Sequence, residues 1–107
     1  MITIEDFFKT ELKVAKVVSA EAIPNSHKLI KLSVDLGEET RVLVAGIARE
    51  YPADDLLGRQ VVVVTNLQPA KLMGVESQGM VLAVDRPDGS LALMQPSAEV
   101  EPGTRVS

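Results

Sequence analysis

The chain has 107 residues, of which 46% are hydrophobic and 24% charged, and it contains no cysteine. This length is enough for one folded domain with a hydrophobic core, which we expect to comprise residues 1–107. Without cysteine, disulfides and thiolate metal sites are excluded. No apolar run approaches the ~18 residues of a membrane-spanning helix, and the acidic N-terminal segment lacks the features of a secretory signal. We therefore expect a cytoplasmic protein with no membrane partner.

The formal net charge is −4, whereas nucleic-acid-binding domains usually carry an excess of basic residues. The charge is unevenly distributed, because residues 12–34 hold four lysines and a single acidic residue, a local charge of +3. These residues are Lys13, Lys16, Lys28, Lys31 and Glu21. This division allows one face to bind phosphate while the rest of the surface stays negative. The alternative is that the lysines only solvate exposed strand positions.

The N-terminal part of the chain predicts a short helix followed by a long strand. Residues 3–9 form the helix, with Thr3 as its cap, and Phe7 and Phe8 are expected to pack it onto the body or onto a second copy. Residues 12–23 form the strand. Two adjacent valines break its alternation, so we expect a bend near residues 15–16, as a small closed barrel requires.

Five further strands follow. A turn at residues 24–26 leads into residues 29–36, which alternate apolar and polar side chains as a half-buried antiparallel strand does. A hairpin at residues 37–39 leads into a strand at residues 40–47. A helical turn at residues 51–58, a strand at 60–65, a strand at 80–84, a turn at 86–89 and a short strand at 91–94 complete the pattern.

A helix between the third and fourth strands is typical of the five-stranded Greek-key barrel known as the OB-fold. We therefore predict an all-β fold, a five-stranded Greek-key OB-fold barrel with short peripheral helices. The tail from about residue 95 to residue 107 is expected to be a C-terminal extension that wraps the surface.

The stretch from residue 66 to residue 84 is the one that the rest of the chain is organised around. It connects two apolar runs, 61–64 and 80–84, for which we predict two buried strands. A proline and two glycines make the connection too irregular for a tight hairpin. Lys71, Ser77 and Gln78 are then expected on an exposed, well-braced loop, where function is common. A purely structural crossover is equally compatible with these residues.

The residues give little support to catalysis. The only histidine, His27, lies in a polar turn, where a plain surface residue is favoured over a base or ligand. We expect no catalytic residues, no metal site and no cofactor. The only aromatic residues are Phe7, Phe8 and Tyr51, none on a predicted barrel strand, which disfavours base stacking along an extended strand. The remaining way to bind nucleic acid is through contacts to phosphate and the 2′-hydroxyl, which depend on the shape of the nucleic acid.

The string PAKLMGVESQGMVLA closely resembles the Lys-Leu-x-Gly-x-x-Ser-(Glu/Gln)-Gly-Met signature of the structure-specific tRNA-binding domain family. The strings IEDFFKTELKVAKVV, PNSHKLIKLSVDLG and PGTRVS also fall in family order. That family includes the C-terminal appendix of bacterial methionyl-tRNA synthetases and a free-standing tRNA-binding protein. The resemblance implies a module that is not an enzyme by itself and that recognises the folded shape of tRNA, as appendix or partner of the catalytic region of a methionyl-tRNA synthetase.

Carried over position by position, the resemblance implies a set of tRNA-binding residues. These are Lys13, Asn25, Lys28, Arg41, Lys71, Ser77, Gln78 and Met80. For Met80, filling of the core is favoured over contact with RNA, and Asn66 is expected to brace its loop. Met73 stands where the family often has a basic residue.

The resemblance also implies a homodimer that pairs through its terminal segments. The candidate residues are Ile4, Phe7, Phe8, Val100 and Val106. The alternative is that these segments only cover their own barrel. A sister family of the same fold suggests an alternative function, a dimeric protein-binding or secretion-chaperone module.

Overall fold

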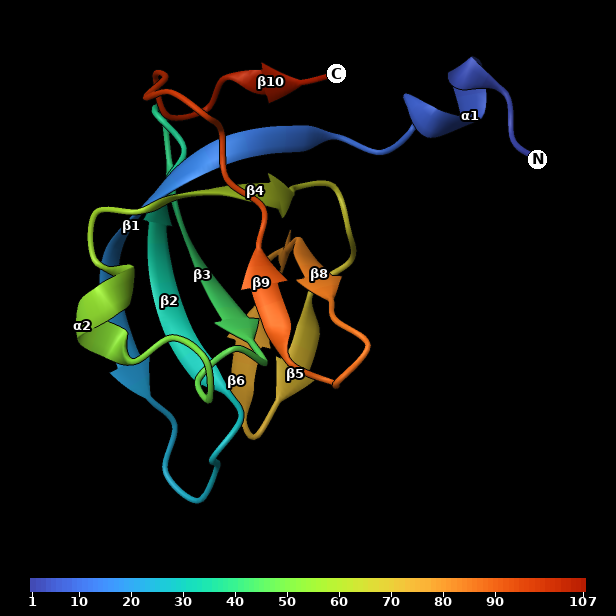
Figure 1. Ribbon diagram of the computed structural model, residues 1–107. Helices are drawn as coiled ribbons and strands as arrows, with labels where there is room; N and C mark the ends of the chain where they lie inside the picture. Colours follow the sequence, from blue (N-terminus) through green and yellow to red (C-terminus); the bar gives the residue numbers. More distant parts are fainter.

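The computed structural model of the chain describes all of residues 1–107 and consists mainly of strands wound into a barrel (Figure 1). In chain order the elements are α1 (Ile4–Phe7), β1 (Leu12–Ala22), β2 (Ile30–Asp35), β3 (Thr40–Ala45), α2 (Ala53–Leu56), β4 (Gln60–Val64), β5 (Ala70–Leu72), β6 (Val75–Ser77), β7 (Met80–Val81), β8 (Ala83–Asp85), β9 (Leu91–Leu93) and β10 (Arg105–Val106). The main sheet has the order β3-β2-β1-β4-β7, and all neighbours are antiparallel. With α2 between β3 and β4, this arrangement confirms the all-β, OB-like barrel.

Strand β2 shows why the sequence folds into this sheet. Ile30, Leu32 and Val34 are buried in the barrel, and the residues between them are only partly buried. Leu32 lies opposite Leu43 of β3, so apolar side chains of neighbouring strands meet on the inner face. The alternation predicted from the sequence is confirmed here. The structure contains no helix long and apolar enough to cross a membrane.

The bend of β1 lies later than predicted. The pairing of β1 with β2 shifts between Val17 and Ser19, not at residues 15–16. Before this point β1 pairs with β4, as far as Lys16 opposite Gln60. A bulge at this point turns β1 from β4 towards β2. Its position depends on both partner strands, so the sequence of β1 alone does not locate it.

The predicted buried strand over residues 80–84 is wrong. The segment divides into β7, which pairs with β4, and β8, which leaves the main sheet and pairs with β9. Met80 and Val84 are 48% and 50% exposed, so neither fills the core.

The connection before residue 80 is irregular as a whole, yet it contains a tight hairpin, β5–β6. Met73 and Gly74 form its two-residue turn with φ of 50° and 80°.

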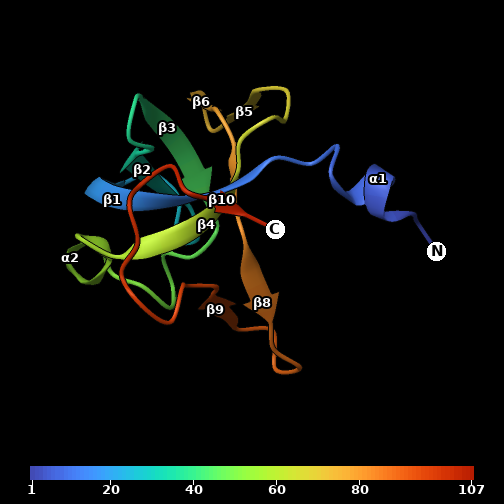
Figure 2. The same cartoon turned by 90° about the horizontal axis from the view of Figure 1, so that it is seen from above.

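The N-terminal helix is present, but it does not pack onto the barrel. Thr3 and Asp6 form a reciprocal capping box, as the acidic first turn favours. None of the helix residues is buried, and α1 projects away from the barrel in both views (Figures 1 and 2). Packing of Phe7 and Phe8 onto the body of the same chain is therefore wrong.

The C-terminal tail closes over the barrel end. Strand β10 pairs with the start of β1, and Gly103 crosses the β2–β3 hairpin with φ 90°, where an added Cβ would lie 2.1 Å from the carbonyl oxygen of Leu36. Val106 packs on a small cluster outside the barrel, formed by Leu12, Val62 and Val64. The extension thus wraps the surface, and Val106 packs against its own chain.

Candidate nucleic-acid interface

Two connections flank the outer face of β2 and β3. One is the turn at residues 23–29, and the other is the β5–β6 hairpin (Figure 1). Asn25 takes φ 67° in the turn and is exposed. The carbonyl of Lys28 accepts from Ala48 N–H, and its side chain lies so close to Gly46 that an added Cβ would be 2.8 Å from Lys28 Cε. Lys28 is thus held beside the end of β3 with its ammonium group exposed.

Ser77 is buried, which overturns its prediction as an exposed loop residue. Only 4% of the residue is exposed, and its Oγ accepts from Val44 N–H at 2.9 Å while donating to the carbonyl of Gly79 at 2.9 Å. The N–H groups at the edge of β3 need acceptors, and Ser77 supplies one. Its role is to close the barrel between β3 and the start of β7.

Gln78 extends the same closure while remaining exposed. Its N–H donates to the carbonyl of Val42 at 2.9 Å, and its Oε1 accepts from Val42 N–H at 3.0 Å. A glutamate would offer the same acceptor, which explains why either residue satisfies the signature. We call residues 77–79 the closing segment. The Ser77 hydroxyl and the backbone N–H and Oε1 of Gln78 are used within the chain.

Arg41 is also held within the chain. Its Nε donates to Glu39, and its Nη1 donates to the carbonyl of Thr65 and, at 3.3 Å, to that of Gln78. The side chain is 24% exposed. The hydrogen bond from Arg41 holds the pKa of the Glu39 carboxyl below its usual value. Arg41 therefore links β3 to the end of β4 and to the closing segment.

Lys13 lies in the same network. Its Nζ is 3.6 Å from Glu11 Oε1, which also accepts from Thr65 Oγ1 at 2.6 Å. The hydrogen bond from Thr65, and then the charge of Lys13, lower the pKa of Glu11. Both cations at this end of the barrel are thus paired with carboxylates.

The predicted cations do not form one cluster. Arg41 lies near the start of β3, whereas the Lys28 side chain lies beside Gly46, five residues further along, a backbone length of about 17 Å at ~3.3–3.4 Å per residue. Lys71 lies opposite Glu76 on the β5–β6 hairpin, and neither Lys71 nor Lys28 has a carboxylate within ion-pair distance. The structure separates paired cations at one end from unpaired ones on the two flanking connections.

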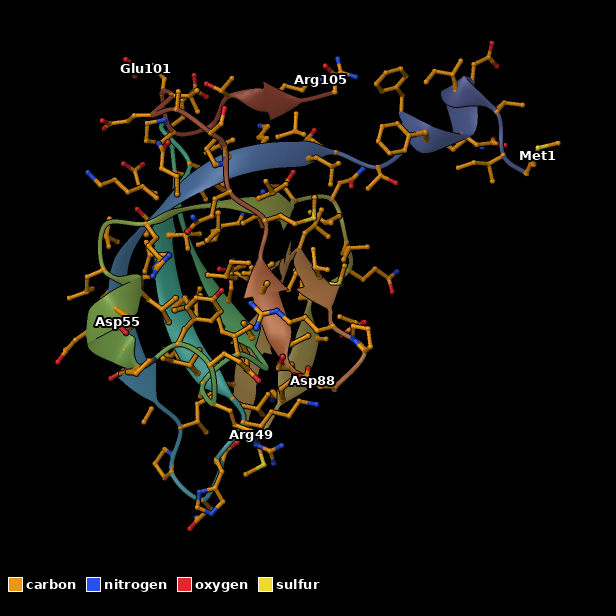
Figure 3. The ribbon with its side chains drawn as sticks, in the orientation of Figure 1. Met1, Arg49, Asp55, Asp88, Glu101 and Arg105 are labelled. Carbon is orange, nitrogen blue, oxygen red and sulfur yellow. The ribbon has the colours of Figure 1, made fainter.

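Three further residues bear on the predicted site. Asn66 braces, as predicted, but it holds the α1–β1 connection, accepting from Glu11 N–H at 2.8 Å and donating to the carbonyl of Lys9. Met80 is a surface residue, contrary to the preference for core. Sequence reasoning missed Arg49, which is exposed at the lower end of the barrel, near the β1–β2 turn (Figure 3). Its position directly after the third strand was the available signal.

Residues 12–105 match the family of tRNA-binding domains, tRNA_bind. The chain belongs to this family. As a member, it is homologous to a segment of methionine–tRNA ligases. It is 54% identical over 106 residues to that of Thermotoga maritima, an alignment that covers 99% of this chain and 17% of the ligase. The ligase of Archaeoglobus fulgidus is 52% identical over 105 residues, covering 98% and 16%. The tRNA-binding domain thus spans about a sixth of these relatives.

A solved structure extends the comparison to the whole domain. A MetRS-related protein from Pyrococcus horikoshii superposes with a TM-score of 0.95 at 42% identity, covering all of this chain and 98% of that one. Tight structural likeness alone does not select the function, because the chaperone CsaA of Bacillus anthracis has a TM-score of 0.92 at 34% identity, covering all of this chain and 99% of that one.

Proposed function

We propose that this tRNA-binding domain grips a folded tRNA on the outer face of β2 and β3, between the β1–β2 turn and the β5–β6 hairpin. The observation that carries the proposal is the placement of Lys28 and Lys71, exposed and without carboxylate partners, on the two connections that flank this face. Barrels of this fold commonly bind nucleic acid there. Arg49 and Asn25 add a cation and an amide at the same end of the barrel.

Recognition proceeds through phosphate and sugar, and so through shape. No aromatic side chain serves this face: Phe7 and Phe8 lie on the projecting helix, and the hydroxyl of Tyr51 accepts from Leu93 N–H. A stacking platform for successive bases is therefore missing. Lysine and asparagine contacts to the backbone fix orientation without reading a base sequence.

We also propose an auxiliary role for the domain in aminoacylation. The ligases that share this segment act on tRNA, so we propose that the domain supplies tRNA affinity, as part or partner of a methionyl-tRNA synthetase, and performs no catalysis by itself. A tRNA ligand is also the reason we propose a cytoplasmic location.

The proposal is tested by removing Lys28 and Lys71, the unpaired lysines on the two flanking connections, together. Each phosphate contact contributes about 0.7–0.9 to the slope of log affinity against log salt. Lys28→Ala with Lys71→Ala should weaken binding of total tRNA and reduce that slope by about 1.4–1.8. The matched control is Lys9→Ala with Arg86→Ala, the same charge change at positions on other segments. Equal slopes for the two double variants in filter binding would remove this face from the function.

We further propose a homodimer in which α1 packs on a second copy. The apolar side chains of Ile4, Phe7 and Phe8 are exposed on the projecting helix, and Arg105 lies over the Phe8 ring at 5.0 Å. An unpartnered apolar helix of this kind is expected to bury its face. Wild type should sediment at twice the chain mass and Phe7→Ala with Phe8→Ala at the single mass; a monomeric wild type contradicts the dimer.

A second function, binding of unfolded protein, has one observation in its favour. The projecting helix offers exposed apolar side chains outside the barrel, and a chaperone shares the fold. Suppression of client aggregation by a protein that does not retain tRNA would favour this function over tRNA binding.

A further inference from the structure

Two adjoining hollows run between the β1–β2 turn and the β5–β6 hairpin. The larger has a volume of about 680 Å³ and the smaller about 460 Å³, and they share Lys31 and Val75. We call the larger one the loop groove. Ile23 and Pro24 form one wall, and Met73 and Val75 form the other. Its size lies within the range of about 300–1,000 Å³ that is usual for small-ligand sites.

An ion pair lines the loop groove. Glu21 of β1 lies directly opposite Lys31 of β2, and Glu21 Oε1 is 3.3 Å from Lys31 Nζ. Glu76 lines the adjoining hollow, so the two hollows together carry two carboxylates and one ammonium group. This charge repels phosphate, although the unpaired lysines lie on the same two connections. The charges therefore favour different occupants for the groove and for its surroundings.

We propose that the loop groove takes one unstacked nucleobase of the bound tRNA, with an amino-bearing edge directed at Glu21. This proposal rests on tRNA binding by the same face. A base is neutral, which suits the groove charge, and its exocyclic amino group donates to a carboxylate. Lys31 donates to the neighbouring ring nitrogen or carbonyl. In RNA, unpaired bases in loops are the ones that proteins read along their edges.

The walls fit the faces of a base. Met73 is 54% exposed at the hairpin tip, and its thioether side chain is flexible and polarizable, which allows contact with an aromatic ring. Pro24 and Ile23 oppose it across the groove. One base held this way needs no aromatic platform. Met73 thus contributes contact with the base and none with phosphate.

The backbone offers a clean variant for the test. Met73 has φ 50°, a conformation that glycine adopts without strain, so Met73→Gly removes the side chain while suiting the turn. With total tRNA we expect at least about a fivefold loss of affinity and an unchanged salt slope, because no phosphate contact is lost. Met94→Ala, a change at another exposed methionine, should bind as wild type.

Dimethyl sulfate probing of an unmodified methionine tRNA transcript locates the base. Wild type should protect one unpaired adenine or cytosine edge, and Met73→Gly should lose that protection while Met94→Ala keeps it. Glu21→Gln changes tRNA affinity in opposite directions for the two possible occupants of the groove. If a base edge occupies it, tRNA binds more weakly; if a phosphate occupies it, tRNA binds more tightly and with a steeper salt slope. Asp54→Asn on α2 measures the general effect of removing one negative charge.

The outcomes separate this proposal from tRNA binding itself. If Met73→Gly and Glu21→Gln bind as their controls do while the Lys28 and Lys71 double variant is impaired, the base site is wrong and the tRNA face stands. Tighter binding by Glu21→Gln than by Asp54→Asn assigns the groove to phosphate. If wild type retains no tRNA but Met73→Gly loses chaperone activity toward an unfolded client, the groove takes protein and both proposals are wrong.

Discussion

The closing segment begins at the last residue of the β5–β6 hairpin, which forms one wall of the loop groove. The two regions differ in whether their polar groups are bonded within the chain. In the closing segment, Ser77 and Gln78 bond the edge of β3 from both backbone and side chain. Beside the groove, the side chain of Asn25 has no hydrogen-bond partner in the chain. The signature that identifies the family therefore contains both kinds of residue: Ser77 and Gln78 hold the edge of β3, whereas Lys71 and Met73 are exposed on the β5–β6 hairpin.

The largest effect that sharpens this comparison is expected at Ser77. Ser77→Ala leaves the buried N–H of Val44 without an acceptor, which costs about 1–3 kcal/mol of unfolding free energy. In a domain of this size that lowers Tm by several degrees, at roughly 4–8 °C per kcal/mol. Denaturant and thermal unfolding measure the loss. The tRNA salt slope should not change at temperatures where the variant is folded.

Two matched variants control this prediction. Gln78→Glu keeps an acceptor for Val42 N–H, so its unfolding free energy should stay within about 0.5 kcal/mol of wild type. Met73→Gly, at the groove, should be similarly silent in stability. If Ser77→Ala instead keeps full stability and loses tRNA affinity, Ser77 is a ligand contact and the architectural role is wrong.

The sequence predicted the elements that local pattern determines. The alternation in β2 gave the strand and its buried face, and Thr3 followed by acidic residues gave the helix cap. The family resemblance then supplied the family correctly. The predicted tRNA contacts at Lys28 and Lys71 and the predicted dimer remain predictions.

The errors share a physical cause, since each depends on a partner distant in sequence. The bulge after Val17 is set by where β1 exchanges β4 for β2. Burial of Ser77 depends on Val44, 33 residues away. Met80 lies on β7, which stays paired with β4, yet its side chain is exposed, and an apolar run does not reveal which side of the strand is covered. The hydrogen bonds of Arg41 to three separate segments were likewise not visible in the sequence, and its predicted phosphate contact remains a prediction.

The smallest predicted effect is a pH dependence at the paired end of the barrel. The hydrogen bond from Thr65 lowers the pKa of Glu11 from its ordinary 4.5. A carboxylate with a lowered folded-state pKa stabilises the fold above its unfolded pKa, and this stabilisation is lost as pH falls through the folded value. Thr65→Val removes the bond at nearly constant shape.

The cost of Thr65→Val should therefore be full at pH 7, below about 1 kcal/mol because Glu11 is exposed, and should shrink as pH falls below 4.5. Urea unfolding of both proteins between pH 3 and pH 7 measures the difference. In a Glu11→Gln background the carboxylate is gone, so Thr65→Val should cost the same at every pH. A cost that stays constant with Glu11 present means that the Thr65 hydroxyl serves only the Glu11 carbonyl, its other acceptor at 3.2 Å, and that the closed end of the barrel is held by neutral hydrogen bonds.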